Sequence, residues 1–210
     1  LMSMDISKCT KLVSLNASNN QLVSADISKN SQLATVNLAG NQLSSVDVSA
    51  NGLINTLNVS DNKLVLLDVS ANSALLYLDC SYNSLIKVNA SAGISTLTAN
   101  NNNIADIDVK ALEGLKNLNV ADNSLYDIDI TSNKQLEYLD VSGNHLAALD
   151  ITDNTELKKE NVNASGNSRE IYVSSANEAD LTGTYISIDK IAGIETADVA
   201  TGQGLTIGKD

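Results

Sequence analysis

The sequence repeats itself about every 21 residues, and this period restricts the fold more than any other feature of the chain. Each unit contains two similar halves with the pattern L-x-x-L-x-(L/V/A)-x-x-N, such as "LVSLNASNN" at 12–20 and "LVSADISKN" at 22–30. Successive units begin at steps of 21 residues, with one step of 19, at these aliphatic positions: Leu12, Leu33, Ile54, Leu75, Ile94, Leu115, Leu136 and Leu157. A unit this small cannot bury its own apolar face, so we predict about seven to eight coils that stack into a solenoid.

Apolar and polar residues alternate within each half-unit, which indicates β-strands. In "TLNVS" at 56–60, Leu57 and Val59 point to one side and their neighbours to the other. Half-units of ten or eleven residues leave no room for a helix and its connections. The predicted fold is therefore an all-β solenoid with two short extended passes per coil and few or no helices. We predict a structural role for the Asn that ends most half-units, such as Asn41 and Asn51, because its amide can bond corner backbone groups.

The regular pattern extends over residues 1–167 and then fails. Residues 168–210 contain β-like runs, "TYISID" and "GLTIG", which predict a C-terminal β cap or the start of a second β module. Residues 1–9 match the second half of a unit, so we expect the solenoid to be truncated at its N-terminal end. Irregular corners are expected at two places, because 85–94 is two residues short and "KALEG" at 110–114 lacks the Asn.

Charge and composition argue against several classes of partner and chemistry. The net charge of −12 and the pI of about 4.3 disfavour nucleic acid and anionic membranes, because both attract clustered Lys and Arg. No apolar run approaches the ~20 residues that span a bilayer, so we expect no membrane insertion. One histidine, His145, and two cysteines, Cys9 and Cys80, do not make a metal-ligand set, and no phosphate-binding, dinucleotide-binding or nucleophile motif occurs. We predict a protein without enzymatic activity and without a cofactor.

The repeat unit also has the signature of a known family. "LLYLDCSYNSL" at 75–85 matches the leucine-rich repeat pattern L-x-x-L-x-L-x-x-N-x-L, with Cys80 at its third apolar position. Over residues 1–167, the period, the "LDVS" half-unit and this cysteine resemble the internalin-J-like leucine-rich repeats of bacterial surface proteins, as in Bacteroides and Listeria. The resemblance implies a secreted or surface-held bacterial protein used for adhesion or ligand capture, with a concave face on the first strands. Cys80 is the one cysteine at its position in the repeat, so the family's cysteine ladder is not carried over.

The outward residues of the first strand predict a polar, nearly uncharged surface that contains two tyrosines. The candidate ligand-binding residues on this surface are Tyr77, Tyr138, Asp79, Asp140, Asn58 and Asn119. Hydrogen-bonding side chains with two aromatic contacts suit a protein of a host or neighbouring cell, or a glycan. We expect the chain to bind as a monomer. Two alternatives stay open: the polar face only keeps the sheet soluble in a rigid spacer of a larger surface protein, or its Thr and Asn side chains order water.

A second set of polar residues falls on the second strand and consists of aspartates, with Asn89 as the one exception. Asp5 begins the set, and its candidate metal ligands are Asp26, Asp47, Asp68, Asp108, Asp129 and Asp150. Carboxylates one strand spacing apart repel each other by about 0.9 kcal/mol even in water, so another interaction must offset the repulsion. The Ser or Thr two residues further on and the turn amides can donate hydrogen bonds to them, or Ca²⁺ can bind between them. We expect hydrogen bonding and no metal, because the glycine-rich calcium-binding nonapeptide is absent.

Overall fold

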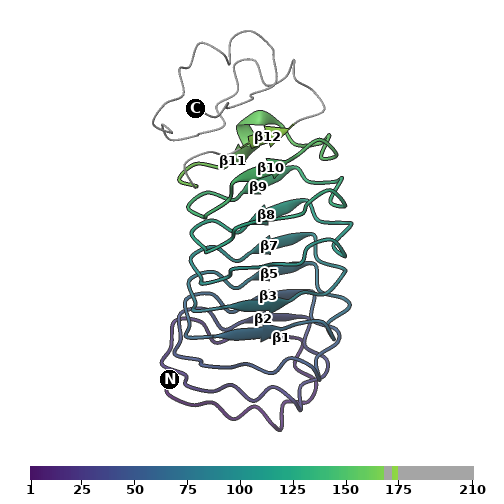
Figure 1. Cartoon of the computed structure of the whole chain (residues 1–210). Coiled ribbons are helices and arrows are strands. Elements are labelled where there is room, and N and C mark those ends of the chain that lie inside the picture. Colours follow the sequence, from purple (N-terminus) through teal and green to yellow (C-terminus); the bar gives the residue numbers. More distant parts are fainter. Residues whose placement is uncertain (168–171, 175–210) are drawn as a thin grey trace.

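Each repeat unit forms one coil of a parallel β-solenoid in the computed structural model, which describes residues 1–167 and 172–174 (Figure 1). The described residues make about seven coils of roughly 21 residues with almost no helix, so the fold predicted from the repeat is confirmed. We call the segment that opens each unit the first pass and the segment that returns the second pass. The coils stack in chain order, from the N-terminal end at the bottom of Figure 1 to β12 near the top.

The first passes form one eight-stranded parallel sheet in chain order. Its strands are β1 (Ser14–Asn16), β2 (Thr35–Asn37), β3 (Thr56–Asn58), β5 (Tyr77–Asp79), β7 (Thr96–Thr98), β8 (Asn117–Asn119), β9 (Tyr138–Asp140) and β11 (Val162–Asn163). The apolar residue of each strand points into the solenoid, and Leu57 and Val59 are both buried, as predicted. Buried aliphatic residues from successive coils join into one continuous core.

The second passes pair less completely than the first. β4 (Leu66–Asp68) pairs with β6 (Lys87–Asn89), and β10 (Ala148–Asp150) pairs with β12 (Tyr172–Ser174), each in a two-stranded parallel sheet. The other second passes of the described chain are not strands. Continuous strand pairing therefore holds the coils at strand spacing on the first-pass side.

The corner after each first pass combines a left-handed residue with a buried or half-buried Asn. Eight residues at the same place have φ between 51° and 66°: Asn19, Gly40, Asp61, Tyr82, Asn101, Asp122, Gly143 and Gly166. The Asn that follows connects two coils. In Asn41, Nδ2 donates to the carbonyls of Ala17 and Leu38. Its Oδ1 accepts the N–H of Leu22, so the predicted structural role of the Asn is confirmed at this corner.

The corner after each second pass contains a buried Asn that is only partly satisfied. Its members are Asn30, Asn51, Asn72, Asn133 and Asn154. Each Nδ2 donates to two carbonyls of the preceding coil, whereas each Oδ1 is buried without a hydrogen-bond partner in the described chain. Leu112 occupies the same place and keeps the turn, because its N–H donates to Val109 and its carbonyl accepts from Leu115. The irregular corner predicted at 110–114 is therefore wrong: a buried leucine replaces the Asn.

The other irregularities leave the sheet intact. The short unit at 85–94 keeps one turn at its corner, in which the N–H of Ile94 donates to the carbonyl of Ser91. The strand that follows, β7, pairs in register with β5. A 3₁₀ turn, η1 (Lys159–Asn161), precedes β11. Val162 pairs with Leu139, so the last step of the sheet is two residues longer than the usual 21.

The predicted C-terminal β cap lies largely outside the described residues. Within 168–210, the structure describes only β12, which extends the second-pass side by pairing with β10. In the part of the chain that the structure describes, no helix is long and apolar enough to cross a membrane.

Candidate functional site

Two strands of the eight-stranded sheet carry the same exposed tripeptide, Tyr-Leu-Asp. It forms β5 and β9, which are separated in the sheet by β7 and β8, hence by three strand spacings or about 14 Å. Tyr77 is 52% exposed and Tyr138 is 37% exposed, while Leu78 and Leu139 between Tyr and Asp are buried. Each tyrosine therefore stands on a strand that is fixed by a buried leucine, with its own side chain exposed.

The six predicted site residues form two equivalent groups, which we call the first and second tyrosine groups. In the first group, Asn58 of β3 lies beside β5, and its Nδ2 donates to Oδ2 of Asp79 over 3.3 Å. In the second group, Asn119 of β8 pairs in register with Asp140 of β9. The sheet therefore brings together the three residues within each group and keeps the two groups apart.

Hydrogen bonds fix the polar side chains of both groups. Oδ1 of Asp79 accepts the N–H and the hydroxyl of Ser81, and Asp140 is bonded in the same way to Ser142. Burial, the negative charge of Asp140 and a hydrogen bond to it raise the pKa of Tyr138. The Tyr138 phenol is protonated at neutral pH, as an ordinary tyrosine is, and its hydroxyl is directed to Asp140. These side chains lose little conformational freedom when a partner binds, because they are already ordered.

The Asp residues of the second passes make the same local hydrogen bonds. Oδ1 of Asp26, for example, accepts the N–H and the hydroxyl of Ser28, and these bonds lower the pKa of the Asp26 carboxyl. A salt bridge from Lys110 at 2.8 Å, together with Thr131, lowers the pKa of Asp129 to about 2. Of the two interpretations of this ladder, hydrogen bonding is the one that the contacts support.

No group of three or more His, Cys, Asp or Glu side chains in the described residues is placed to hold a metal ion. Each Asp of the second passes uses one carboxylate oxygen in its turn, whereas Ca²⁺ takes six to eight oxygen ligands. The histidine and cysteines do not add ligands. His145 is exposed and stacks its ring at 5.1 Å from that of Tyr126, Cys9 is exposed, and Cys80 is buried.

No protein-family model and no curated protein matches the sequence. Solved structures do match it. The functional domain of InlJ from Listeria monocytogenes is similar with a TM-score of 0.61 at 28% identity, over 88% of this chain and 44% of that one. The TM-score is 0.67 for internalin C2 of the same organism, at 20% identity over 86% of this chain and 80% of that one. Toll, from the Toll–Spatzle complex of Drosophila, has a TM-score of 0.62 at 21% identity, over 74% of this chain and 25% of that one.

The chain has a leucine-rich-repeat fold. This leucine-rich-repeat chain spans less than half of the InlJ domain, so it corresponds to a part of that domain. The InlJ domain includes a cysteine ladder. Here the leucine-rich repeats place Val59 and Ala99 next to Cys80 at that position, and all three are buried as ordinary core residues.

The leucine-rich-repeat corner also contains a residue that the sequence reasoning missed, Tyr82. Its φ of 52° lies in the left-handed region, and the other members of this ladder are Asn, Asp or Gly, which adopt that region more readily. A residue with a Cβ loses roughly 1–2 kcal/mol there, yet Tyr82 is 58% exposed and fills no core space. The signal was available in the sequence, because Tyr82 is an aromatic residue in a column of Asn, Asp and Gly.

Proposed function

We propose that this leucine-rich-repeat chain is a non-enzymatic protein-binding module that uses the outward face of the eight-stranded sheet. The observation that carries the proposal is the pair of tyrosine groups, with Tyr77 and Tyr138 exposed on rigid strands. Tyrosines on a preformed surface are common anchors of protein interfaces, because they bury a large area with little entropy loss. Toll, a solenoid of the same fold, binds a protein partner in its complex with Spatzle, which supports the same use here.

The finer part of the proposal concerns the partner and its place. The internalin-like fold favours an extracellular or cell-surface module that adheres to a protein of a host or neighbouring cell. The net charge of −12 favours a neutral or basic partner over nucleic acid. A glycan is the second candidate ligand, because each group offers an aromatic ring beside a carboxylate and an amide.

The test is a binding array of cell-surface proteins and glycans, probed with the full chain. The double substitution Tyr77→Ala/Tyr138→Ala should weaken binding to any hit by at least tenfold, as expected when two interface anchors are removed. Tyr126→Ala is the matched control, because Tyr126 is also exposed but lies outside the sheet. Unchanged binding by the double variant, or an equal loss in the control, would place the contact surface elsewhere.

The alternative function is a rigid spacer. It is favoured by the continuous core and by the unbroken register of the eight-stranded sheet, both of which resist bending. A spacer predicts that the chain captures nothing on the array and that both tyrosines can be replaced without consequence for the parent protein. Any saturable hit that depends on Tyr77 or Tyr138 therefore decides against the spacer.

A further inference from the structure

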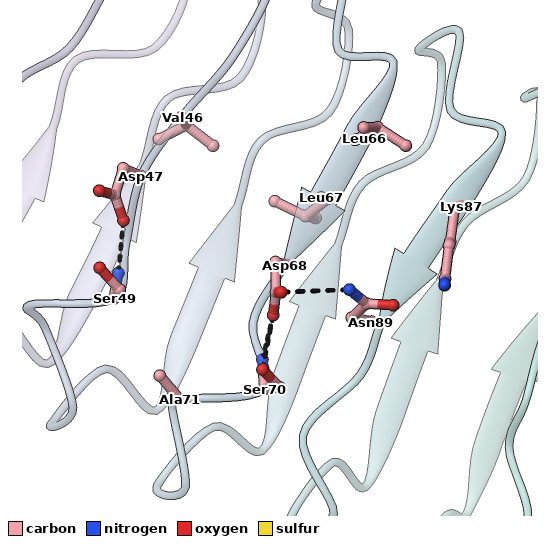
Figure 2. A pocket seen from close by; sticks show the side chains of 10 residues that line it. All are labelled: Val46, Asp47, Ser49, Leu66, Leu67, Asp68, Ser70, Ala71, Lys87 and Asn89. Carbon is pink, nitrogen blue, oxygen red and sulfur yellow. Dashed lines mark hydrogen bonds between the residues drawn. The ribbon is translucent and has the colours of Figure 1, made fainter.

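A groove of about 650 Å³ lies on the second-pass side, away from the tyrosine groups. It is lined by parts of three successive second passes, 46–49, 66–71 and 87–89 (Figure 2). β4 forms one wall and belongs to a two-stranded sheet with β6, so the edge of β4 toward 46–49 is not covered by another strand. The groove thus lies beside an edge of β4 that pairs with no other strand of the described residues.

Three exposed aliphatic side chains lie at or beside the rim of this groove. Leu66 is 59% exposed and belongs to the lining, and its neighbour Val65 is 46% exposed. Ile86 is 55% exposed and lies on the next coil, where its N–H donates to the Val65 carbonyl over 2.9 Å. The repeat places Ser45, Lys87, Asp106 and Asp127 at the position of Leu66 in other coils. The position of Val65 and Ile86 is apolar elsewhere too, because Val23 is 62% exposed there. The feature that distinguishes this groove is therefore the exposed Leu66 beside Val65 and Ile86.

The lining of the groove also includes two exposed carboxylates, Asp47 and Asp68, on adjacent coils. One oxygen of each accepts a hydrogen bond from the Ser two residues further on. The second oxygen of Asp68 accepts from Asn89 over 3.1 Å. Neither carboxylate takes part in the two salt bridges of the described chain, and Lys87 stands at the far end of the groove (Figure 2). In the described part of the chain, no salt bridge therefore pairs Asp47 with a cation.

We propose that this groove binds an arginine side chain of a basic partner protein, together with an aliphatic residue beside that arginine. A guanidinium ion is satisfied by a few carboxylate oxygens in one plane, whereas Ca²⁺ needs six to eight ligands that the groove does not offer. The aliphatic part of the arginine packs on Leu66 while its charged end reaches Asp47 and Asp68. The net charge of −12 attracts a basic partner to the chain as a whole, and Asp47 and Asp68 would bind its charge within the groove.

The experiment is an NMR titration of the ¹⁵N-labelled full chain with the peptide acetyl-Leu-Arg-Leu-amide. The matched probe is the same peptide with citrulline, which has the shape of arginine without its charge. We expect saturable shift changes confined to residues 46–49, 66–71 and 87–89 with the arginine peptide, and binding weaker by about tenfold with citrulline. No saturable response, equal binding of both peptides, or shifts along the whole Asp ladder would overturn the proposal.

Four variants assign the contact. Asp47→Asn/Asp68→Asn should weaken binding of the arginine peptide by about tenfold and keep the fold, because Asn58 makes the same turn hydrogen bond elsewhere in the chain. Lys87→Gln should strengthen binding, since it removes a competing positive charge. Asp108→Asn, on the same ladder outside the groove lining, is the control and should change nothing. Tyr77→Ala/Tyr138→Ala should also leave this titration unchanged, which separates a failure here from a failure of the sheet-face proposal.

Discussion

The two Asn ladders should respond very differently to the same substitution. Asn123, after a first pass, makes four side-chain hydrogen bonds: three from Nδ2 to carbonyls and one from the N–H of Ile104 to its Oδ1. Asn133, after a second pass, makes two, and its buried Oδ1 has no partner in the described chain. We predict that Asn123→Leu destabilises the protein strongly and that Asn133→Leu is nearly neutral.

The magnitudes follow from these contacts. Asn123→Leu leaves the Ile104 N–H buried without an acceptor, which costs about 1–3 kcal/mol, and removes donors from three carbonyls at about 1 kcal/mol or less each. A total of about 4 kcal/mol is expected. Asn133→Leu loses two hydrogen bonds, about 2 kcal/mol, but it also removes an unpaired buried oxygen and buries an apolar side chain. The net cost should be about 0–1 kcal/mol, because Leu112 already occupies this place in the next-lower coil and is 1% exposed.

Urea denaturation of both variants, followed by circular dichroism, measures the difference. We expect a gap of about 3 kcal/mol in the free energy of unfolding, or about 10 °C in Tm for a chain of this length. Both substitutions insert the same larger side chain, so the comparison cancels the cost of extra volume. Equal destabilisation by the two variants would refute the claim that an Asn stabilises its corner more where its Oδ1 accepts a hydrogen bond.

Three further predictions concern the exposed corners, the carboxylates and the thiols. Tyr82→Asn should raise the free energy of unfolding by about 1 kcal/mol in a urea melt, and Asn101→Tyr should lower it by a similar amount, because both positions have left-handed backbone. The folded-state pKa of Asp129 is lowered to about 2, so its contribution to stability is present above the unfolded pKa of about 4 and is lost as pH falls from about 4 toward 2. Urea melts across this range should therefore show a smaller loss for Asp129→Asn than for the wild type. Cys9 should react with a thiol reagent in the native protein while Cys80 reacts only after denaturation, because Cys80 is buried and burial raises the pKa of its thiol.

The sequence was sufficient for the architecture because the repeat is local and the same in every coil. The alternation around Leu57 predicts a buried strand residue, and the 21-residue step then places the equivalent residue of the next coil beside it. Register in a solenoid is set by this one step. The shortened unit at 85–94 could also be predicted, since a loss of two residues must fall in a corner if the strands are to stay paired.

The departures from the pattern could not be predicted in the same way. Leu112 stands where the pattern has Asn, which predicted an irregular corner. The turn, however, depends on backbone hydrogen bonds that any residue can make, and the leucine side chain fills the buried place of the Asn. The pairing of β4 with β6, and the groove beside it, depends on how closely two second passes approach. That distance results from corner packing over several coils, which a single repeat unit does not encode.

The regularity of the solenoid gives a physical reason to look for binding residues among the exceptions. A ladder position that repeats as Asn, Ser or Asp is explained by turns and hydrogen bonds within the chain, as for Asp26 and Ser28. Tyr77, Tyr82 and Leu66 have no such explanation: each is more than half exposed. Folding gains little from an exposed aromatic or aliphatic side chain, and at Tyr82 the backbone conformation adds a cost. Such residues are the ones whose burial a partner would complete, on the sheet face at Tyr77 and in the groove at Leu66.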